Sequence, residues 1–155
     1  LGGDTCFASM EAAYEALSAP LRTMLDQLTA THDYTKAFRH VARNPEGAAQ
    51  LEARRKDFPP VHHPVVRTHP ETGRKSLFVT RNFTTRLDGL TDRENDRLLP
   101  FLCDPVQSPD FQCRFRWEPG SEAFWDNRSV QHYAVPDYTG RRSMHRVIVD
   151  GEPVA

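Results

Sequence analysis

One histidine and two arginines near the C-terminal end have the types and spacing that best suit chemistry. His132 follows the segment Trp125-Asp126-Asn127-Arg128 at a predicted turn, and Arg142 and Arg146 come after it. Neutral imidazole suits Fe(II), which non-haem oxygenases bind with two histidines and one carboxylate. Two arginines four residues apart on a strand share one side, where a guanidinium can pair with a carboxylate, phosphate or sulfonate. The pattern suits an iron ligand followed by cations that hold a dicarboxylate cosubstrate and an anionic substrate.

Each of these residues also has a structural explanation when it is taken alone. A histidine among aromatic residues is commonly a packed, hydrogen-bonded group, and Arg141-Arg142 resembles a solvated basic turn. Near the N-terminus, the glycines of Gly2-Gly3-Asp4-Thr5 allow close backbone approach, and the Thr5 hydroxyl could donate to a bound carboxylate. That segment alone predicts no more than a turn. The occurrence of all these groups in one chain favours a site.

Other histidines and the cysteines are weaker candidates. His69 and Glu71 have the spacing of an iron-binding pair, but Pro70 and Thr72-Gly73 predict a hairpin turn on which both side chains face water. His62 and His63 are adjacent, so on a strand they point to opposite faces. The cysteines have no metal-type spacing and predict reduced thiols in a cytosolic protein; they are Cys6, Cys103 and Cys113.

Helical patterns come first in the chain and strand patterns follow. Two helices are predicted between residues 9 and 30, capped by Ser9 and Ser18, and a capping box at Thr91 predicts a later helix. Residues 36–57 predict a partly helical, mobile segment, either a lid or a solvated insertion. The predicted strands are 61–67, 77–79, 112–117 and 147–149. This order predicts an α+β fold with a β-sandwich or jelly roll.

Composition limits the classes of function. The 155 residues fit one domain, and 38% hydrophobic with 26% charged residues is typical of a soluble globular protein. A net charge of −1 excludes an electrostatic field that would recruit nucleic acid or an anionic membrane surface. No signal peptide or bilayer-spanning apolar run is visible. The chain opens Leu1-Gly2-Gly3 without a methionine, so we expect it to begin inside a longer protein.

Taken together, these segments resemble the taurine/alpha-ketoglutarate dioxygenase family, Fe(II)- and 2-oxoglutarate-dependent oxygenases with a jelly-roll core. The resemblance covers nearly the whole chain and is carried by residues 2–8, 13–18, 63–75, 83–86, 125–128 and 144–146. It implies an α+β fold in which a double-stranded β-helix (jelly-roll) core is flanked by helices. The core would be incomplete at the N-terminus of this chain. Residues 1–155 would form the C-terminal two-thirds of a single domain. The family's His-x-Asp motif, which supplies the other two iron ligands, is expected upstream.

The resemblance also implies roles for individual residues. They are His132 as an iron ligand, Arg142 and Thr5 for the distal carboxylate of 2-oxoglutarate, Arg146 for the anionic group of the substrate, and Phe38 and Phe83 as walls of the substrate pocket. The spacing from His132 to Arg142 is one residue shorter than in a taurine-oxidising member of this family. Which of Arg141 and Arg142 turns inward is therefore left open.

The implied activity is hydroxylation of a small anion with molecular oxygen and 2-oxoglutarate. Taurine or another sulfonate is the first expectation, with release of sulfite and an aldehyde, and alkyl sulfates and aryloxyacetates are alternatives because Arg146 would accept any small anion. A non-catalytic jelly-roll remnant is the competing hypothesis; the missing ligands favour it, and the retained His132, Arg142 and Arg146 oppose it. We expect a cytoplasmic enzyme with no nucleic-acid or membrane partner, and a homo-oligomer is left open.

Overall fold

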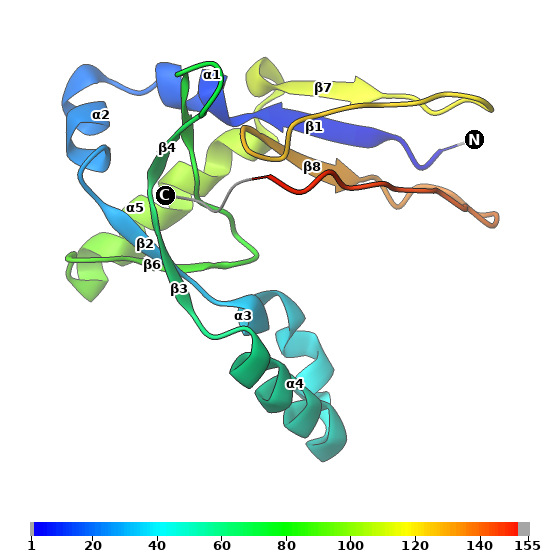
Figure 1. Cartoon of the computed structure of the whole chain (residues 1–155), viewed down its shortest axis with the longest axis horizontal. Coiled ribbons are helices and arrows are strands. Elements are labelled where there is room, and N and C mark those ends of the chain that lie inside the picture. The colour runs from blue at the N-terminus through cyan, green and yellow to red at the C-terminus, as the bar shows by residue number, and fades with distance from the viewer. Residues whose placement is uncertain (1, 152–155) are drawn as a thin grey trace.

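Residues 2–151 are described by the computed structural model, and their first sheet joins segments from both ends of the chain (Figure 1). Strand β1 (Thr5–Ser9) is its central strand. It pairs in antiparallel fashion with β7 (Gln112–Phe115) on one side and with β8 (Val130–Ala134) on the other. The segment with the Gly-Gly-Asp-Thr motif is thereby placed directly beside the strand that carries His132.

A second three-stranded sheet and a hairpin come from the middle of the chain. Strand β2 (Thr29–His32) lies between β3 (Val61–Pro64) and β6 (Thr84–Leu87), and all pairs are antiparallel. Strands β4 (Val66–Thr68) and β5 (Lys75–Leu77) form the hairpin. Together with the helices of the chain, these sheets confirm the predicted α+β class.

Three helices pack against the sheets, and local sequence signals fix where they begin. Helix α1 (Met10–Glu15) begins after Ser9, whose hydroxyl accepts from the Ala12 N–H at 3.2 Å. Helix α2 (Ala19–Leu25) has Pro20 in its first turn, and Ser18 occupies the cap position without a side-chain hydrogen bond. Helix α5 (Asp92–Cys103) has the predicted capping box between Thr91 and Glu94.

Residues 34–57 are helical almost throughout, which exceeds the partly helical structure that we predicted for 36–57. Helix α3 (Tyr34–Phe38), a 3₁₀ turn (Arg39–Arg43) and helix α4 (Pro45–Asp57) follow one another and lie apart from the sheets in Figure 1. Asn44 caps α4 by accepting from the Gly47 N–H at 2.8 Å. A Cβ atom on Gly47 would lie 1.9 Å from the Val41 carbonyl oxygen, so glycine is required where α4 approaches the 3₁₀ turn.

The core lies between α1, α2 and α5 and the middle strands. Its largest fully buried side chains include Leu25, Leu77, Leu87 and Leu102. Short 3₁₀ turns (Asp104–Gln107 and Pro109–Phe111) lead from α5 into β7. One buried amide, Asn95, joins α5 to β6: its Oδ1 accepts from the Leu87 N–H at 2.6 Å, and its Nδ2 donates to the Leu87 carbonyl at 3.1 Å.

Replacing Asn95 with alanine is expected to lower the free energy of unfolding by about 2 kcal/mol, because the Leu87 N–H and C=O would stay buried without their partner. Chemical denaturation monitored by circular dichroism measures the change. The exposed neighbour provides the control, since Asp96→Ala should shift stability by no more than about 0.5 kcal/mol. Equal losses in the two variants would contradict the role given to Asn95.

Several local predictions were wrong. Residues 29–32 form a strand, although we predicted helix as far as residue 30. Cys113 is exposed, although its alternation with Gln112 and Arg114 along the predicted strand 112–117 favours the buried side. The segment 147–149 is not a strand: no partner pairs with it among residues 2–151, and Val147 is 91% exposed. A β-branched run favours extended backbone, but a strand also needs an edge to pair with.

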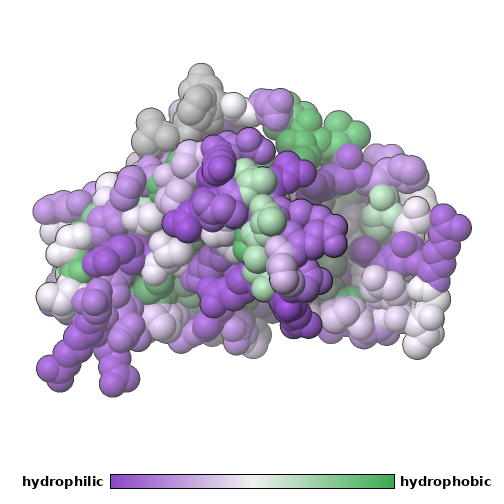
Figure 2. Space-filling model, turned by 90° about the horizontal axis from the view of Figure 1, so that it is seen from below, coloured by the Kyte–Doolittle hydropathy of each residue, from purple (hydrophilic) through white to green (hydrophobic). Residues whose placement is uncertain are grey.

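The face turned toward the viewer in Figure 2 is mainly hydrophilic, and its hydrophobic residues occur in separate groups. Helix α4 is exposed along most of its length, with Gly47 as its buried residue. None of the described helices has the length and apolar character required to cross a bilayer.

Candidate functional site

The pairing of β1 with β8 brings two predicted site residues onto one face of the first sheet. Phe7 lies directly opposite His132, and Thr5 lies opposite Ala134. Residues directly opposite each other in an antiparallel pair project to the same face, as do residues two apart on one strand. Thr5 and His132 therefore share a face, although 127 positions separate them in the sequence.

Aromatic rings hold the His132 imidazole in place. The ring centroid of Trp125 lies 5.2 Å from that of His132, and the Phe7 centroid lies 6.3 Å away. Partial burial lowers the pKa of His132, and the charge of Arg146 lowers it further. At neutral pH the imidazole is therefore uncharged, which is the form that binds metals. The residue remains exposed enough to reach a ligand.

Thr5 is buried, and its hydroxyl has one proton left to donate. The indole N–H of Trp117 donates to Thr5 Oγ1 at 2.9 Å, which engages the oxygen as an acceptor. Within residues 2–151 no acceptor is found for the hydroxyl proton of Thr5. A carboxylate oxygen of a bound ligand would provide one.

Arg142 lies against the glycine segment at the start of β1. A Cβ atom on Gly3 would be 2.7 Å from both Cδ and Nε of Arg142, so the arginine side chain passes where only a glycine leaves room. The Arg142 guanidinium carbon lies 5.8 Å from the Tyr138 ring centroid. Arg142 is half-buried and Arg141 is exposed. Of the two, Arg142 is the arginine that turns inward, toward the strand of Thr5.

The backbone at three of the predicted site residues differs from prediction. His132 lies in the middle of strand β8, whereas we expected a turn; the turn falls earlier, at residues 127–129. Arg142 and Arg146 are not on a strand, since the structure assigns no regular element to residues 141–151. Their even spacing therefore does not place them on one side, and what brings Arg142 inward is its contact with Gly3.

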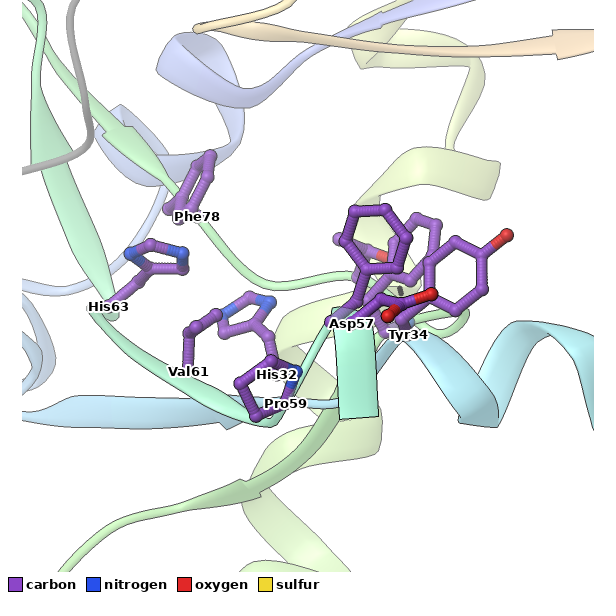
Figure 3. Close-up of a pocket in the computed structure, with 10 residues that line it drawn as sticks. His32, Tyr34, Asp57, Pro59, Val61, His63 and Phe78 are labelled. Carbon is purple, nitrogen blue, oxygen red and sulfur yellow. Dashed lines mark hydrogen bonds between the residues drawn. The ribbon is translucent and has the colours of Figure 1, made fainter. Parts of the chain in front are cut away.

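One of the two predicted wall residues lines a cavity of about 500 Å³ (Figure 3). Phe83 lines the cavity directly. Phe38 does not line it but stacks on Tyr34, which does, at a centroid distance of 4.5 Å. Two histidines that we did not select, His32 and His63, also line it.

His69, which we placed in solvent, is buried, with only 6% of its surface exposed. Its Nε2 lies 3.0 Å from an oxygen of Asp126, just before β8. Arg128 binds Asp126 and also pairs bidentately with Glu71, at 2.9 and 2.7 Å. The result is a cluster, His69/Glu71/Asp126/Arg128, that fastens the turn after β4 to the turn before β8.

This cluster has metal-like geometry but already contains a cation. One potential ligand atom from each of His69, Glu71 and Asp126 lies within 4.8 Å of the others. The Arg128 guanidinium is hydrogen-bonded to both carboxylates and therefore offsets part of their negative charge. Hydrogen bonds from Arg128 are also the main cause of the lowered pKa of Asp126 and of Glu71. We infer a positioning role for the cluster, through the Trp125 turn that packs on His132.

The cluster predicts a pH dependence of stability. Because the folded-state pKa values of Asp126 and Glu71 lie below their unfolded values, their stabilisation is complete above about pH 5 and is lost as the pH falls. Arg128→Gln should therefore show a smaller drop in melting temperature than wild type between pH 6 and pH 3. Arg116→Gln, at an exposed arginine outside the cluster, is the control and should keep the wild-type drop. A wild-type pH profile in Arg128→Gln would contradict this assignment.

The residues present suit Fe(II) and 2-oxoglutarate. His132 offers an uncharged imidazole, Thr5 offers a buried hydroxyl proton without an acceptor in the described part of the chain, and Arg142 offers a guanidinium beside the same strand. Imidazole is a common iron ligand, and a guanidinium with a hydroxyl suits a carboxylate. Within residues 2–151 His132 is not part of any three-residue metal cluster, so it would supply a single ligand.

Comparison with known proteins agrees with this chemistry. Residues 1–148 match the family described as taurine catabolism dioxygenase TauD, TfdA family. The chain is 39% identical to an alkylsulfatase of Acinetobacter baylyi, covering 97% of this chain and 49% of that protein. It is 40% identical to an alpha-ketoglutarate-dependent sulfonate dioxygenase of Saccharomyces cerevisiae, covering 88% of this chain and 32% of that protein.

A solved structure shows the same arrangement of elements. The crystal structure of a taurine dioxygenase from Burkholderia xenovorans superposes with a TM-score of 0.71 at 39% identity, covering 88% of this chain and 42% of that one. The chain thus spans less than two thirds of each protein compared. From its sequence, its fold and the match over residues 1–148, the chain belongs to the TauD/TfdA family of alpha-ketoglutarate-dependent dioxygenases.

Proposed function

We propose that the complete protein, of which this chain is a part, is an Fe(II)- and 2-oxoglutarate-dependent dioxygenase that oxidises a small organic anion. The observation that carries the proposal is the placement of His132 and Thr5 on one face of the β7-β1-β8 sheet, with Arg142 packed against Gly3, two residues before the same central strand. A non-catalytic remnant would have no reason to keep the imidazole, the hydroxyl and the guanidinium in this arrangement.

In this proposal each residue has a defined task. His132 would supply one iron ligand, and the other two would come from a part of the protein outside residues 1–155. Arg142 and Thr5 would bind the distal carboxylate of 2-oxoglutarate, which orients the cosubstrate. Bound Fe(II), with 2-oxoglutarate and molecular oxygen, would supply the oxidising power for substrate hydroxylation. The two three-stranded sheets would belong to the double-stranded β-helix that we predicted.

The substrate would be a small sulfonate or sulfate ester, with aryloxyacetates as the alternative. Arg146 supports an anionic substrate, because it lies close enough to His132 to lower the pKa of the imidazole. Hydroxylation at the carbon next to a sulfonate would release sulfite and an aldehyde. The relatives named for sulfate and sulfonate chemistry support both anion classes equally. Measuring succinate formation with Fe(II) and 2-oxoglutarate across a panel of sulfonates, sulfate esters and aryloxyacetates tests the proposal. The proposal would be refuted if no compound of the panel increased succinate formation.

Arg146→Ala is expected to raise the KM for the anionic substrate by about 30-fold or more, with a smaller change in kcat, because it removes a charge-assisted contact worth roughly 2 kcal/mol or more. Initial rates at saturating 2-oxoglutarate measure both constants. Arg116→Ala changes an exposed arginine elsewhere and should leave both constants at their wild-type values. An unchanged substrate KM in Arg146→Ala would remove this residue from the proposed site.

A further inference from the structure

The cavity in Figure 3 is large and its walls are mostly rings. It measures about 500 Å³, which lies in the range of cavities that hold small organic ligands. It is surrounded by strands β2 and β3, the end of α4 and residues 78–83. The aromatic side chains that line it belong to His32, Tyr34, Phe58, His63, Phe78 and Phe83. In Figure 3 the rings of His32, His63 and Phe78 gather at one end, and Tyr34 and Asp57 lie at the other.

The histidine end of the cavity contains buried polar atoms without partners. His32 is 8% exposed, and no hydrogen-bond partner for its Nε2 or for Nδ1 of His63 is found among the described residues. The Nδ1 atom of His32 lies 3.5 Å from the Thr84 hydroxyl, which can donate to it. With the Thr84 hydroxyl as the donor to Nδ1, the ring proton lies on Nε2, where it has no acceptor among the described residues. Such a donor destabilises the folded protein unless a ligand or water accepts from it.

These histidines are uncharged, so they suit a neutral acceptor better than an anion. Burial lowers the pKa of His32 to about 4, and burial together with the nearby charge of Arg67 lowers the pKa of His63. Arg67 is itself buried, with its guanidinium carbon 5.6 Å from the Phe78 ring centroid. The positive field of Arg67 favours an oxygen atom at this end of the cavity over a second donor.

The cavity wall is connected to the strand that carries His132. Gln131, the residue before His132, donates from Nε2 to the Val79 carbonyl at 2.9 Å. The two residues that flank Val79 are Phe78 and Thr80, and both line the cavity. The side chain of Gln131 therefore joins the backbone of the cavity wall to strand β8, one residue before the proposed iron ligand.

We propose that this cavity receives the uncharged end of the substrate, a ring or branched chain that carries an acceptor oxygen, and that His32 and His63 recognise this oxygen. The inference rests on the proposed function, because Arg146 must hold the anionic end. Taurine is a poor fit, because its chain of two methylene groups is too short to fill the cavity. Its ammonium group also offers hydrogen-bond donors, whereas the histidines require an acceptor. The preferred substrate would be a sulfonate or sulfate ester with a bulky, oxygen-bearing group.

Three sulfonates separate the contributions. Ethanesulfonate has the anionic group alone, 3-phenylpropanesulfonate adds a ring, and 2-phenoxyethanesulfonate has the same ring with an ether oxygen in place of one methylene. Calorimetric titration of the complete protein without added iron would measure each Kd, and succinate formation with iron would be measured in parallel. We expect the phenylpropyl ligand to bind at least about tenfold more tightly than ethanesulfonate, and the phenoxy ligand about fivefold more tightly again. If sulfate esters are the preferred anion class, the corresponding esters replace the sulfonates.

Two kinds of variant assign these preferences to residues. His32→Phe keeps a ring but removes the donor, so the preference for the ether over its methylene analogue should disappear, and His32→Gln, which keeps a donor, should restore part of it. Val61→Trp fills the cavity from an exposed strand position that tolerates a large residue, so the ring preference should fall by at least about tenfold. His62→Phe is the matched control, since His62 is exposed and lies outside the cavity lining.

The outcomes distinguish this inference from the function it rests on. Ring-dependent binding that Val61→Trp removes, with an ether preference that His32→Phe removes, supports the inference whether or not succinate forms. Equal Kd values for the three sulfonates, or an ether preference that survives in His32→Phe, overturn it, even if ethanesulfonate supports succinate formation. Absence of succinate with every substrate would refute the proposed dioxygenase activity separately. Should His32→Phe fail to fold by circular dichroism, the Val61→Trp comparison decides.

Discussion

His132→Ala is expected to abolish substrate-dependent succinate formation by the complete protein, with a loss of at least about 1,000-fold. The reason is the ligand count: non-haem iron sites of this kind use three protein ligands, and a site with two holds Fe(II) weakly and in a different geometry. Stability should change little, because His132 is exposed at the surface of β8 and makes no hydrogen bond through its side chain within the described residues. The loss would therefore be chemical, with the fold retained.

Two measurements separate this explanation from general damage. Metal analysis after incubation with Fe(II) should show wild-type protein retaining about one iron and His132→Ala retaining little, and circular dichroism should give similar melting temperatures. His62→Ala, which changes another exposed histidine, should keep both turnover and iron. Wild-type turnover in His132→Ala would remove His132 from the metal site and, with it, the central element of the proposed function.

The sequence predicted those parts of the structure that depend on neighbouring residues. The cap at Ser9 and the capping box at Thr91 each involve groups three residues apart, so the pattern alone identified the helix starts. The turn at residues 69–73 was predicted correctly for the same reason. The family resemblance, which rests on whole blocks of residues, predicted the match over residues 1–148.

Features that depend on distant partners were not predictable in this way. His69 is buried because its Nε2 reaches Asp126, 57 positions away, and no local signal marks that contact. His32 and His63 face each other only because β2 pairs with β3, with ring centroids 5.3 Å apart. Arg142 turns inward because of Gly3 rather than through strand periodicity. The Gly2-Gly3 pair was the available signal, since adjacent glycines indicate close approach of another segment.

Arg142→Met is expected to raise the KM for 2-oxoglutarate by about 100-fold, while kcat at saturating 2-oxoglutarate falls much less. Methionine keeps much of the length and packing of the arginine stem but cannot form the charge-assisted pair, whose loss corresponds to about 3 kcal/mol of binding free energy. Titration of 2-oxoglutarate at fixed substrate, with succinate as the readout, measures both constants. Arg141→Met is the matched control, because Arg141 is adjacent but exposed, and its KM should stay near the wild-type value.

A second variant tests the same position without removing the charge. Gly3→Ala places a methyl group 2.7 Å from Cδ and Nε of Arg142 and is strained at a φ of 76°, so the guanidinium must move away from the strand of Thr5. We therefore expect Gly3→Ala to raise the KM for 2-oxoglutarate at least about tenfold, in the same direction as Arg142→Met. Gly140→Ala, where an added Cβ meets nothing within 4 Å, should have no such effect. The opposite result would be a raised KM in Arg141→Met with an unchanged KM in both Arg142→Met and Gly3→Ala. In that case Arg141 holds the cosubstrate, and the packing of Arg142 against Gly3 serves only to join the two ends of the chain.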